Sequence, residues 1–423
     1  MSEPAIVRDV LPNGLRVLTE RMPHVRSVSI GVWLTRGSRH ESAAQSGIAH
    51  FVEHMLFKGT ATRSAEEIAQ TVDSIGGQMD AFTAKEYAGY YLKVLDEHLP
   101  LAIDVLSDIV MNPAFRDDDI EREKKVVLEE IKMVEDTPDD LVHELFTERF
   151  WAGHPLGRPI LGQPETVDAL NADVLRHYFS GVYTAPNLIV AAVGNIEHER
   201  VRDLVARAFD ALPRLSMVAP ETPPSVVPGV TIRHKDLEQS HVCLGTSGYR
   251  QDHADRYASY ALNTVLGGSM SSRLFQNVRE KRGLAYAVFS GLSAYRDTGT
   301  MTVYAGCAND AVSELIDVVV AELRRIKDEP LGDAELQRAK DHLKGSLMLN
   351  LESTSSRMSH MARQEIYFEQ QQGLDETLQG VGLVTQEDVQ RVARDLFAEG
   401  QLAATVVGAV DGLTIPAERL SLG

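Results

Sequence analysis

The chain has 423 residues, of which 43% are hydrophobic and 24% charged, and its formal net charge is −19 at pH 7. This length predicts about two or three globular domains. The excess of acidic residues excludes a nucleic-acid-binding protein, which needs basic patches. No run of about eighteen apolar residues occurs, so no membrane-spanning helix is expected.

The first residues and the cysteines predict a cytoplasmic location. Residues 1–9 lack a basic stretch followed by an apolar one, so a secretory signal is not expected. Cys243 and Cys307 each lie in a strand-like segment, and buried thiols in a reducing compartment are favoured over a disulfide. The acidic balance is compatible with basic substrates, although solubility alone also explains it.

In chain order, the first half begins with two expected strands, at 14–19 and 28–34. The second alternates and then becomes continuously apolar, which is typical of a largely buried strand. A helix is expected to begin after Ser64 with a capping box and to end at Gly76 and Gly77. The other expected elements are strands at 78–84 and 87–95, helices at 99–110, 117–134, 136–150 and 173–178, a buried strand at 188–193 and an amphipathic helix at 197–211.

The motif H-x-x-E-H lies between these strands and is formed by His50, Glu53 and His54. Two histidines four residues apart on a helix project about 40° from one another, so both imidazoles can reach one metal ion. Glu53 lies on the same face, close to a water that the metal would hold. This order of residues is the inverzincin signature. The alternative is two histidines that share an amphipathic helix by chance, and the motif favours zinc over it.

The acidic helix at 117–134 is the expected source of a third ligand, because a catalytic zinc usually has three protein ligands and a water. Glu123 and Glu130 are seven residues apart and share one face. If that face meets the metal, Glu130 is the ligand and Glu123 supports the ligands from outside the set. Periodicity alone favours this arrangement no more than a solvated acidic helix.

The prolines at 213–228 predict a linker, since such a segment continues neither a helix nor a central strand. We therefore expect an N-terminal zinc-binding domain at 1–218, a linker at 219–229 and a C-terminal domain at 230–423. Residues 87–131 align with 303–347 at a shift of 216 residues, which indicates a duplicated unit. The expected fold class is α+β, with two homologous α+β domains in tandem and metal chemistry only in the first.

The sequence resembles the pitrilysin/insulinase group of zinc peptidases, in its processing-peptidase branch, and is similar to the beta subunit of mitochondrial processing peptidase. The resemblance extends over most of the chain. The segments that carry it are the metal motif with Phe57-Lys58-Gly59-Thr60, Gly76-Gly77 followed by Ala81-Phe82-Thr83, Glu123 with Val127–Ile131, Leu266–Phe275, and Arg279 with Tyr286. Asp80 departs from the family, in which many members have asparagine.

The resemblance implies a role for each of these residues. It implies that His50, His54 and Glu130 bind one zinc ion per chain and that Glu53 is the general base. Glu123 is the second glutamate of the family pattern. The resemblance also implies that Arg279 and Tyr286 contact the substrate or the tetrahedral intermediate. The strand of Ala81, Phe82 and Thr83 is the one on which relatives bind the substrate as an added strand.

The family also implies an assembly and an activity. Most members of this branch enclose a chamber with two such chains, as the two walls of a clamshell. Because the metal set and the Arg/Tyr pair occur together here, a cytoplasmic bacterial homodimer that cleaves unfolded or presequence-like peptides is expected. The alternatives are a non-catalytic structural or peptide-binding member and a catalytic subunit that needs a different partner.

Overall fold

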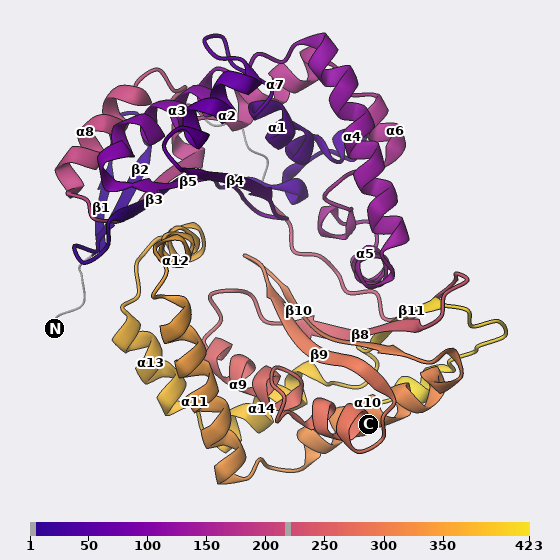
Figure 1. The fold of residues 1–423 in the computed structure, drawn as a ribbon. Helices are drawn as coiled ribbons and strands as arrows, with labels where there is room; N and C mark the ends of the chain where they lie inside the picture. The colour runs from indigo at the N-terminus through magenta and orange to yellow at the C-terminus, as the bar shows by residue number, and fades with distance from the viewer. Residues whose placement is uncertain (1–5, 216–220) are drawn as a thin grey trace. The chain divides into compact units, whose positions relative to one another are not determined.

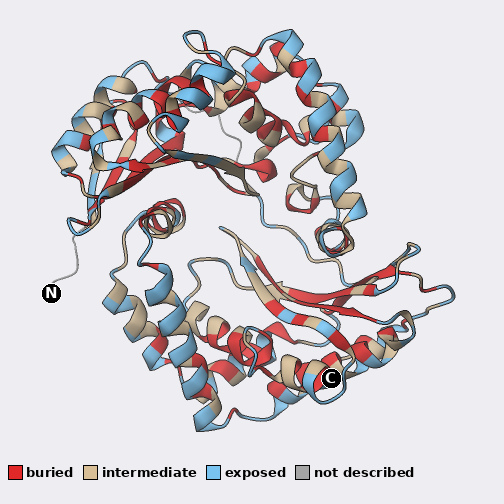
Figure 2. Cartoon of the chain, in the orientation of Figure 1, coloured by how far each residue is buried: buried red, intermediate tan, exposed pale blue. Residues whose placement is uncertain are grey.

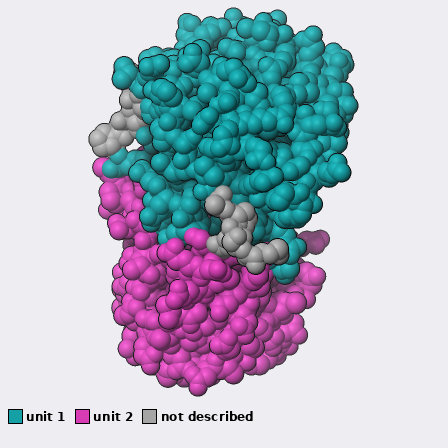
Figure 3. Space-filling model, turned by 90° about the vertical axis from the view of Figure 1, so that its left-hand side faces the viewer, with its two compact units in different colours: residues 1–132, 158–221, 349–372 teal, residues 133–157, 222–348, 373–423 magenta. Residues whose placement is uncertain are grey.

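The computed structural model describes residues 6–215 and 221–423, which form two compact α+β units. The first unit contains the described residues of 1–132, 158–221 and 349–372, and the second contains 133–157, 222–348 and 373–423 (Figure 3). Each unit has one sheet and its own hydrophobic core. The two tandem α+β domains expected from the sequence are therefore confirmed.

The sheet of the first unit has six strands in the order β1-β2-β6-β3-β5-β4. Strands β2 and β6 are parallel, and the other neighbours are antiparallel. The strands are β1 (Ile6–Val10), β2 (Arg16–Arg21), β3 (Ser27–Leu34), β4 (Gln78–Thr83), β5 (Ala88–Leu95) and β6 (Leu188–Gly194). Nearly all of β3 and β6 is buried, as their apolar runs predict. β4 is an edge strand, which leaves one side of its backbone without a strand partner among the described residues.

Five helices, α1, α2, α3, α7 and α8, cover one face of this sheet, and α12 lies on the other face (Figure 1). The helices of the unit are α1 (Ile48–Leu56), α2 (Ala65–Asp73), α3 (Leu99–Met111), α4 (Asp117–Asp136, of which 117–132 belong here), α6 (Pro164–Asp168), α7 (Ala172–Val182), α8 (His198–Ala208) and α12 (Thr354–Phe368). The helix expected at 173–178 is thus longer than its sequence pattern indicates.

The second unit has a five-stranded sheet in the order β7-β11-β8-β10-β9. The strands are β7 (Gly229–His234), β8 (Ser240–Gly248), β9 (Ala285–Ala294), β10 (Gly299–Cys307) and β11 (Ala403–Gly408). The helices are α5 (Pro138–Phe150), α9 (Arg256–Leu266), α10 (Val312–Asp328), α11 (Asp333–Asn350), α13 (Leu374–Leu383) and α14 (Gln386–Leu396). A π-helix occupies Phe275–Glu280.

The two sheets have the same topology. Strands β2-β6-β3-β5-β4 and β7-β11-β8-β10-β9 share their order, with one parallel pair at the start of each series. Helices α4 and α11 begin at residues 117 and 333, and α5 and α12 begin at 138 and 354, so each pair is 216 residues apart. The structure therefore repeats at the interval that the sequence comparison indicates.

Equivalent helices of the two repeats are exchanged between the units. Helix α5, from the first half of the chain, packs against β8 and β11 in the second unit. Helix α12, from the second half, packs against β3 and β6 in the first unit. The compact units therefore differ from the contiguous domains at 1–218 and 230–423, because each sheet buries its second face under a helix from the other repeat. Within the expected linker, residues 221–228 form neither helix nor strand, and 219–220 lie outside the described residues.

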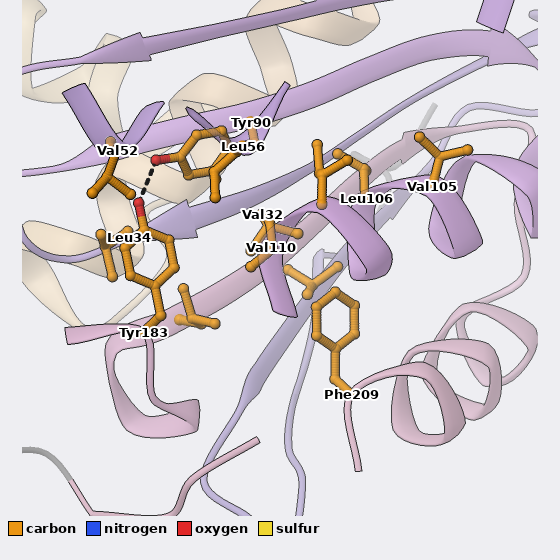
Figure 4. Close-up of a cluster of buried hydrophobic side chains, with 14 of the residues drawn as sticks. Val32, Leu34, Val52, Leu56, Tyr90, Val105, Leu106, Val110, Tyr183 and Phe209 are labelled. Carbon is orange, nitrogen blue, oxygen red and sulfur yellow. Dashed lines mark hydrogen bonds between the residues drawn. The ribbon is translucent and has the colours of Figure 1, made fainter. Parts of the chain in front are cut away.

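The core of the first unit holds α1 against the sheet. Buried residues lie on the sheet and on the helix faces turned toward it (Figure 2). In the part of the core shown in Figure 4, Val52 and Leu56 of α1 pack with Tyr90 of β5, whose hydroxyl is 2.6 Å from that of Tyr183. None of the helices in the described part of the chain is both long and apolar enough to cross a bilayer.

We predict that Glu365→Gln destabilises the protein by about 2–4 kcal/mol. The Glu365 side chain is fully buried on α12 and forms ion pairs with Arg8 of β1 and Arg16 of β2. The variant leaves the mostly buried Arg16 without its counter-charge, while Arg8 is partly solvated and loses less. Urea unfolding measures the change. The exposed Glu352→Gln should shift the midpoint by no more than about 0.5 kcal/mol, and equal midpoints for both variants would refute the prediction.

Candidate metal centre

Helix α1 presents polar side chains on the side that faces away from the core. Ile48, Phe51, Val52, Met55 and Leu56 are buried in the first unit. The spacing of these apolar residues leaves His50, Glu53 and His54 together on the remaining face, partly accessible to solvent. Packing of the apolar face therefore determines the direction in which the motif points.

His50, His54 and Glu130 converge on one point. The Nε2 atoms of His50 and His54 are 3.2 Å apart, and Glu130 Oε2 of α4 is 3.6 Å from each of them. Among the described residues, these three form the one group of histidine, cysteine or acidic side chains arranged to hold a metal ion. The structure thus brings together the three ligands expected from the sequence.

The geometry of this group fits a zinc ion. Two nitrogen ligands at about 2.0–2.1 Å from a tetrahedral ion lie about 3.3–3.4 Å apart, close to the 3.2 Å between the two Nε2 atoms. Glu130 Oε2 is buried and has no hydrogen-bond partner in the described part of the chain. A buried carboxylate oxygen without a donor costs free energy, and a cation between the three groups removes that cost.

Glu123 supports His54 from outside the ligand set. Its Oε1 lies 2.8 Å from His54 Nδ1, and its Oε2 lies 2.7 Å from Lys58 Nζ. When His54 donates its Nδ1 proton to Glu123, its Nε2 lone pair is directed toward the metal position. Lys58, one helical turn after His54, neutralises the buried Glu123 carboxylate.

The pKa values of these groups favour metal-binding forms. Burial, with a smaller effect of His54, lowers the pKa of His50 to about 4, so this imidazole is neutral at pH 7. Burial would also lower the pKa of His54, but its hydrogen bond to Glu123 and the charges of Glu130 and Glu123 raise it. Burial opposes ionisation of Glu123, yet hydrogen bonds from His54 and Lys58 hold its pKa below the ordinary value.

Glu53 lies beside the metal group and contacts the edge strand. The Thr83 hydroxyl, at the end of β4, donates a hydrogen bond to Glu53 Oε2. Burial raises the pKa of Glu53, and the bond from Thr83 partly opposes that effect. A carboxylate with a raised pKa is suited to accept and return a proton near neutral pH.

The remaining residues of β4 have distinct environments. Ala81 packs against the core of the first unit, and Phe82 contacts the Trp33 ring edge to face. Asp80, the departure from the family pattern, accepts hydrogen bonds from its neighbouring Ala81 N–H and from the Tyr91 hydroxyl. Asp80 therefore braces the strand next to the segment expected to bind substrate.

Arg279 and Tyr286 lie together in the second unit. The Arg279 guanidinium is 4.7 Å from the centre of the Tyr286 ring and 4.8 Å from that of Phe275. Arg279 belongs to the π-helix, a feature that often marks functional sites. Tyr286 is 78% exposed, which is unusual for a large aromatic residue. The cation–π contact keeps both side chains at one exposed position.

Sequence reasoning did not identify Lys58 or the Thr83 hydroxyl as parts of the site. Lys58 had a usable signal, because it lies four residues after His54 and hence on the same helix face. The role of Thr83 had none, since the contact with Glu53 joins a helix and a strand 30 residues apart.

Two histidines and a glutamate around one point, with a further carboxylate beside them, define a zinc hydrolase site. A family model described as Insulinase (Peptidase family M16) matches residues 16–164, and one described as Peptidase M16 inactive domain matches residues 169–343. The chain therefore belongs to the insulinase family of peptidases, peptidase family M16.

Relatives and solved structures agree with this assignment. The chain is 44% identical to the uncharacterized zinc protease YmxG of Bacillus subtilis, with 95% of this chain and 98% of that protein covered. It is 43% identical to the uncharacterized zinc protease SCO5738 of Streptomyces coelicolor, over 92% of this chain and 87% of the relative. A crystal structure of a protease from Helicobacter pylori superposes with a TM-score of 0.89 at 26% identity, over 96% and 99% of the two chains. The chain is thus a zinc peptidase by class.

We predict that Glu123→Gln weakens zinc binding by about 10–100-fold. The amide no longer provides a charged acceptor for His54 and leaves Lys58 without its partner. Competition with a chromophoric chelator measures the affinity. On the same helix, Glu121 is exposed and pairs only with Lys124 among the ion pairs of the described residues, so Glu121→Gln should bind zinc as the wild type does. Equal affinities for all three proteins would exclude this role of Glu123.

Proposed function

We propose that the protein is a zinc-dependent endopeptidase that cleaves unfolded peptides or presequence-like segments. The observation that carries the proposal is the convergence of His50, His54 and Glu130 within hydrogen-bonding or ion-pairing distance, with Glu53 on the same helix face. Membership of the insulinase family supports peptide-bond hydrolysis as the reaction.

Each residue of the site has a role in this mechanism. A zinc ion held by the three ligands supplies Lewis-acid chemistry and lowers the pKa of water toward about 7. Glu53 accepts the proton of the attacking water and later delivers it to the leaving amine. The hydrogen bond from Thr83 keeps the Glu53 carboxylate in one orientation during both transfers.

The substrate would bind as an additional strand on β4, because one side of this edge strand has free backbone donors and acceptors. Recognition through backbone atoms explains how one enzyme accepts many sequences. We assign Arg279 and Tyr286 to the substrate backbone or the developing oxyanion, since a guanidinium and a phenol are strong donors for that charge. Their exposed, mutually stacked arrangement supports this assignment.

The alternative function is that of a non-catalytic peptide-binding or structural member. The family model for the second half is described as an inactive domain, which makes this alternative specific. The presence of three ligands and Glu53 in the first half favours catalysis. A third possibility, a catalytic subunit that needs a different partner, is disfavoured because Arg279 and Tyr286 belong to the same chain.

We predict that Glu53→Gln lowers peptide cleavage by at least about 100-fold, because the amide accepts no proton from water. Cleavage of a quenched, unstructured basic peptide measures the rate, and zinc is measured in the same samples. Both proteins should hold about one zinc per chain. Glu66→Gln changes an exposed residue of α2 and serves as the control that retains wild-type activity.

The combination of rate and zinc content distinguishes the functions. Loss of cleavage with retained zinc supports Glu53 as the base. One zinc per chain with no cleavage by the wild type supports the peptide-binding alternative, and restoration of cleavage by a second protein supports the subunit alternative. Undiminished cleavage by Glu53→Gln would contradict the mechanism.

We further propose that two copies enclose the reaction chamber, in the bacterial cytoplasm. The buried free thiols Cys243 and Cys307 are compatible with a reducing compartment, and cell fractionation checks this location. The prediction is that the protein purified alone has twice the chain mass of 46.6 kDa and cleaves the peptide without another protein. Light scattering coupled to gel filtration measures the mass. A purely monomeric protein, or an inactive homodimer, would refute this assembly.

A further inference from the structure

Helix α1 begins without a capping side chain of its own. Its N-cap residue is Gly47, with a φ of 94°. A Cβ at this position would lie 2.6 Å from the carbonyl oxygen of Leu161 and 2.9 Å from the Cα of Gly162. A serine or aspartate, the usual N-cap residues, is therefore excluded. The N–H groups of the first turn have no partner within the helix, so they need acceptors from elsewhere.

Glu41 supplies these acceptors from six residues before the N-cap. Its Oε2 accepts a hydrogen bond of 2.9 Å from the Gly47 N–H, and its Oε1 accepts one of 2.8 Å from the Ala49 N–H. The residue is only 5% exposed. Burial raises the pKa of this carboxyl to about 8, and the two backbone bonds oppose that shift. Burial of an acidic group is costly, which indicates a specific use.

His50 depends on this cap more than His54 does. His54 is oriented by Glu123, whereas His50 Nδ1 is buried and has no hydrogen-bond partner in the described part of the chain. Metal-binding histidines are usually oriented through the second ring nitrogen. Ala49, whose N–H is held by Glu41, directly precedes His50 in the chain. The direction of the His50 ring is thus determined by the backbone of the first turn.

We propose that Glu41 is a positioning residue of the metal centre, which fixes His50 through the backbone N–H groups of Gly47 and Ala49. The proposal rests on the ligand set of the proposed function. It gives the metal helix two different supports. Glu123 holds the side chain of one histidine, and Glu41 holds the main chain that carries the other.

The test compares Glu41→Gln with a helix-cap variant that is distant from the ligands in the chain. In Glu41→Gln one acceptor oxygen is replaced by an NH2 group, which faces a backbone N–H. Ser64→Ala removes the side-chain cap of α2, a helix in the same unit that has no ligand. For each purified full-length protein, chelator competition measures the zinc dissociation constant, and thermal unfolding measures the midpoint of the zinc-free protein.

We expect both variants to lower the midpoint of the zinc-free protein by about 2–4 °C. Only Glu41→Gln should raise the zinc dissociation constant, by about 10-fold or more. Glu41→Asp retains the charge but is one carbon shorter, and it should bind zinc with intermediate affinity. This variant decides the matter if Glu41→Gln does not fold.

Two outcomes would overturn the inference alone. The first is wild-type zinc affinity in a folded Glu41 variant, and the second is an equal loss of affinity in Ser64→Ala. His50→Ala tests the ligand set independently. If His50→Ala retains the zinc content and affinity of the wild type, the proposed metal centre is wrong, and the role of Glu41 falls with it.

Discussion

The metal centre depends on one constraint: two imidazole nitrogens must remain 3.2 Å apart on a helix of nine residues. Such a short helix is not stable in water without tertiary contacts. The apolar face of α1, with Phe51, Val52 and Leu56, provides those contacts by packing into the core of the first unit. The sheet, the crossing helices and the loop before α1 therefore serve the same end, because each holds part of this helix in place.

The polar side of the centre is arranged at a cost in stability. Glu123 is almost fully buried, and Glu130 has a buried oxygen that lacks a donor among the described residues. Lys58 and His54 compensate Glu123, whereas the compensation for Glu130 has to come from a bound cation. Without metal, the three converging groups repel or leave lone pairs unmatched. Zinc binding and the folded geometry of α1 and α4 should therefore stabilise each other.

The sequence predicted those parts of the structure that depend on local spacing. The H-x-x-E-H motif and the seven-residue spacing of Glu123 and Glu130 are periodic features, so they place side chains correctly on α1 and α4. The interval of 216 residues also predicted the repeated unit. Strand β1 was not expected, and neither was the exchange of α5 and α12, because both depend on pairing between distant segments. The ion pair of Arg8 with Glu365, 357 residues apart, has no signature in either local sequence.

Duplication of the fold without duplication of the metal centre has a physical explanation in α9. His50, Glu53 and His54 are the third, sixth and seventh residues of α1, and the corresponding places in α9 are Ala258, Ala261 and Leu262. These three residues are at most 3% exposed. In the second unit, α13 and α14 both pack against α9. A helix covered in this way gains apolar burial but leaves no face open to water and substrate. The first repeat keeps that face polar and accessible, and so retains the chemistry, while the second uses the same helix for stability.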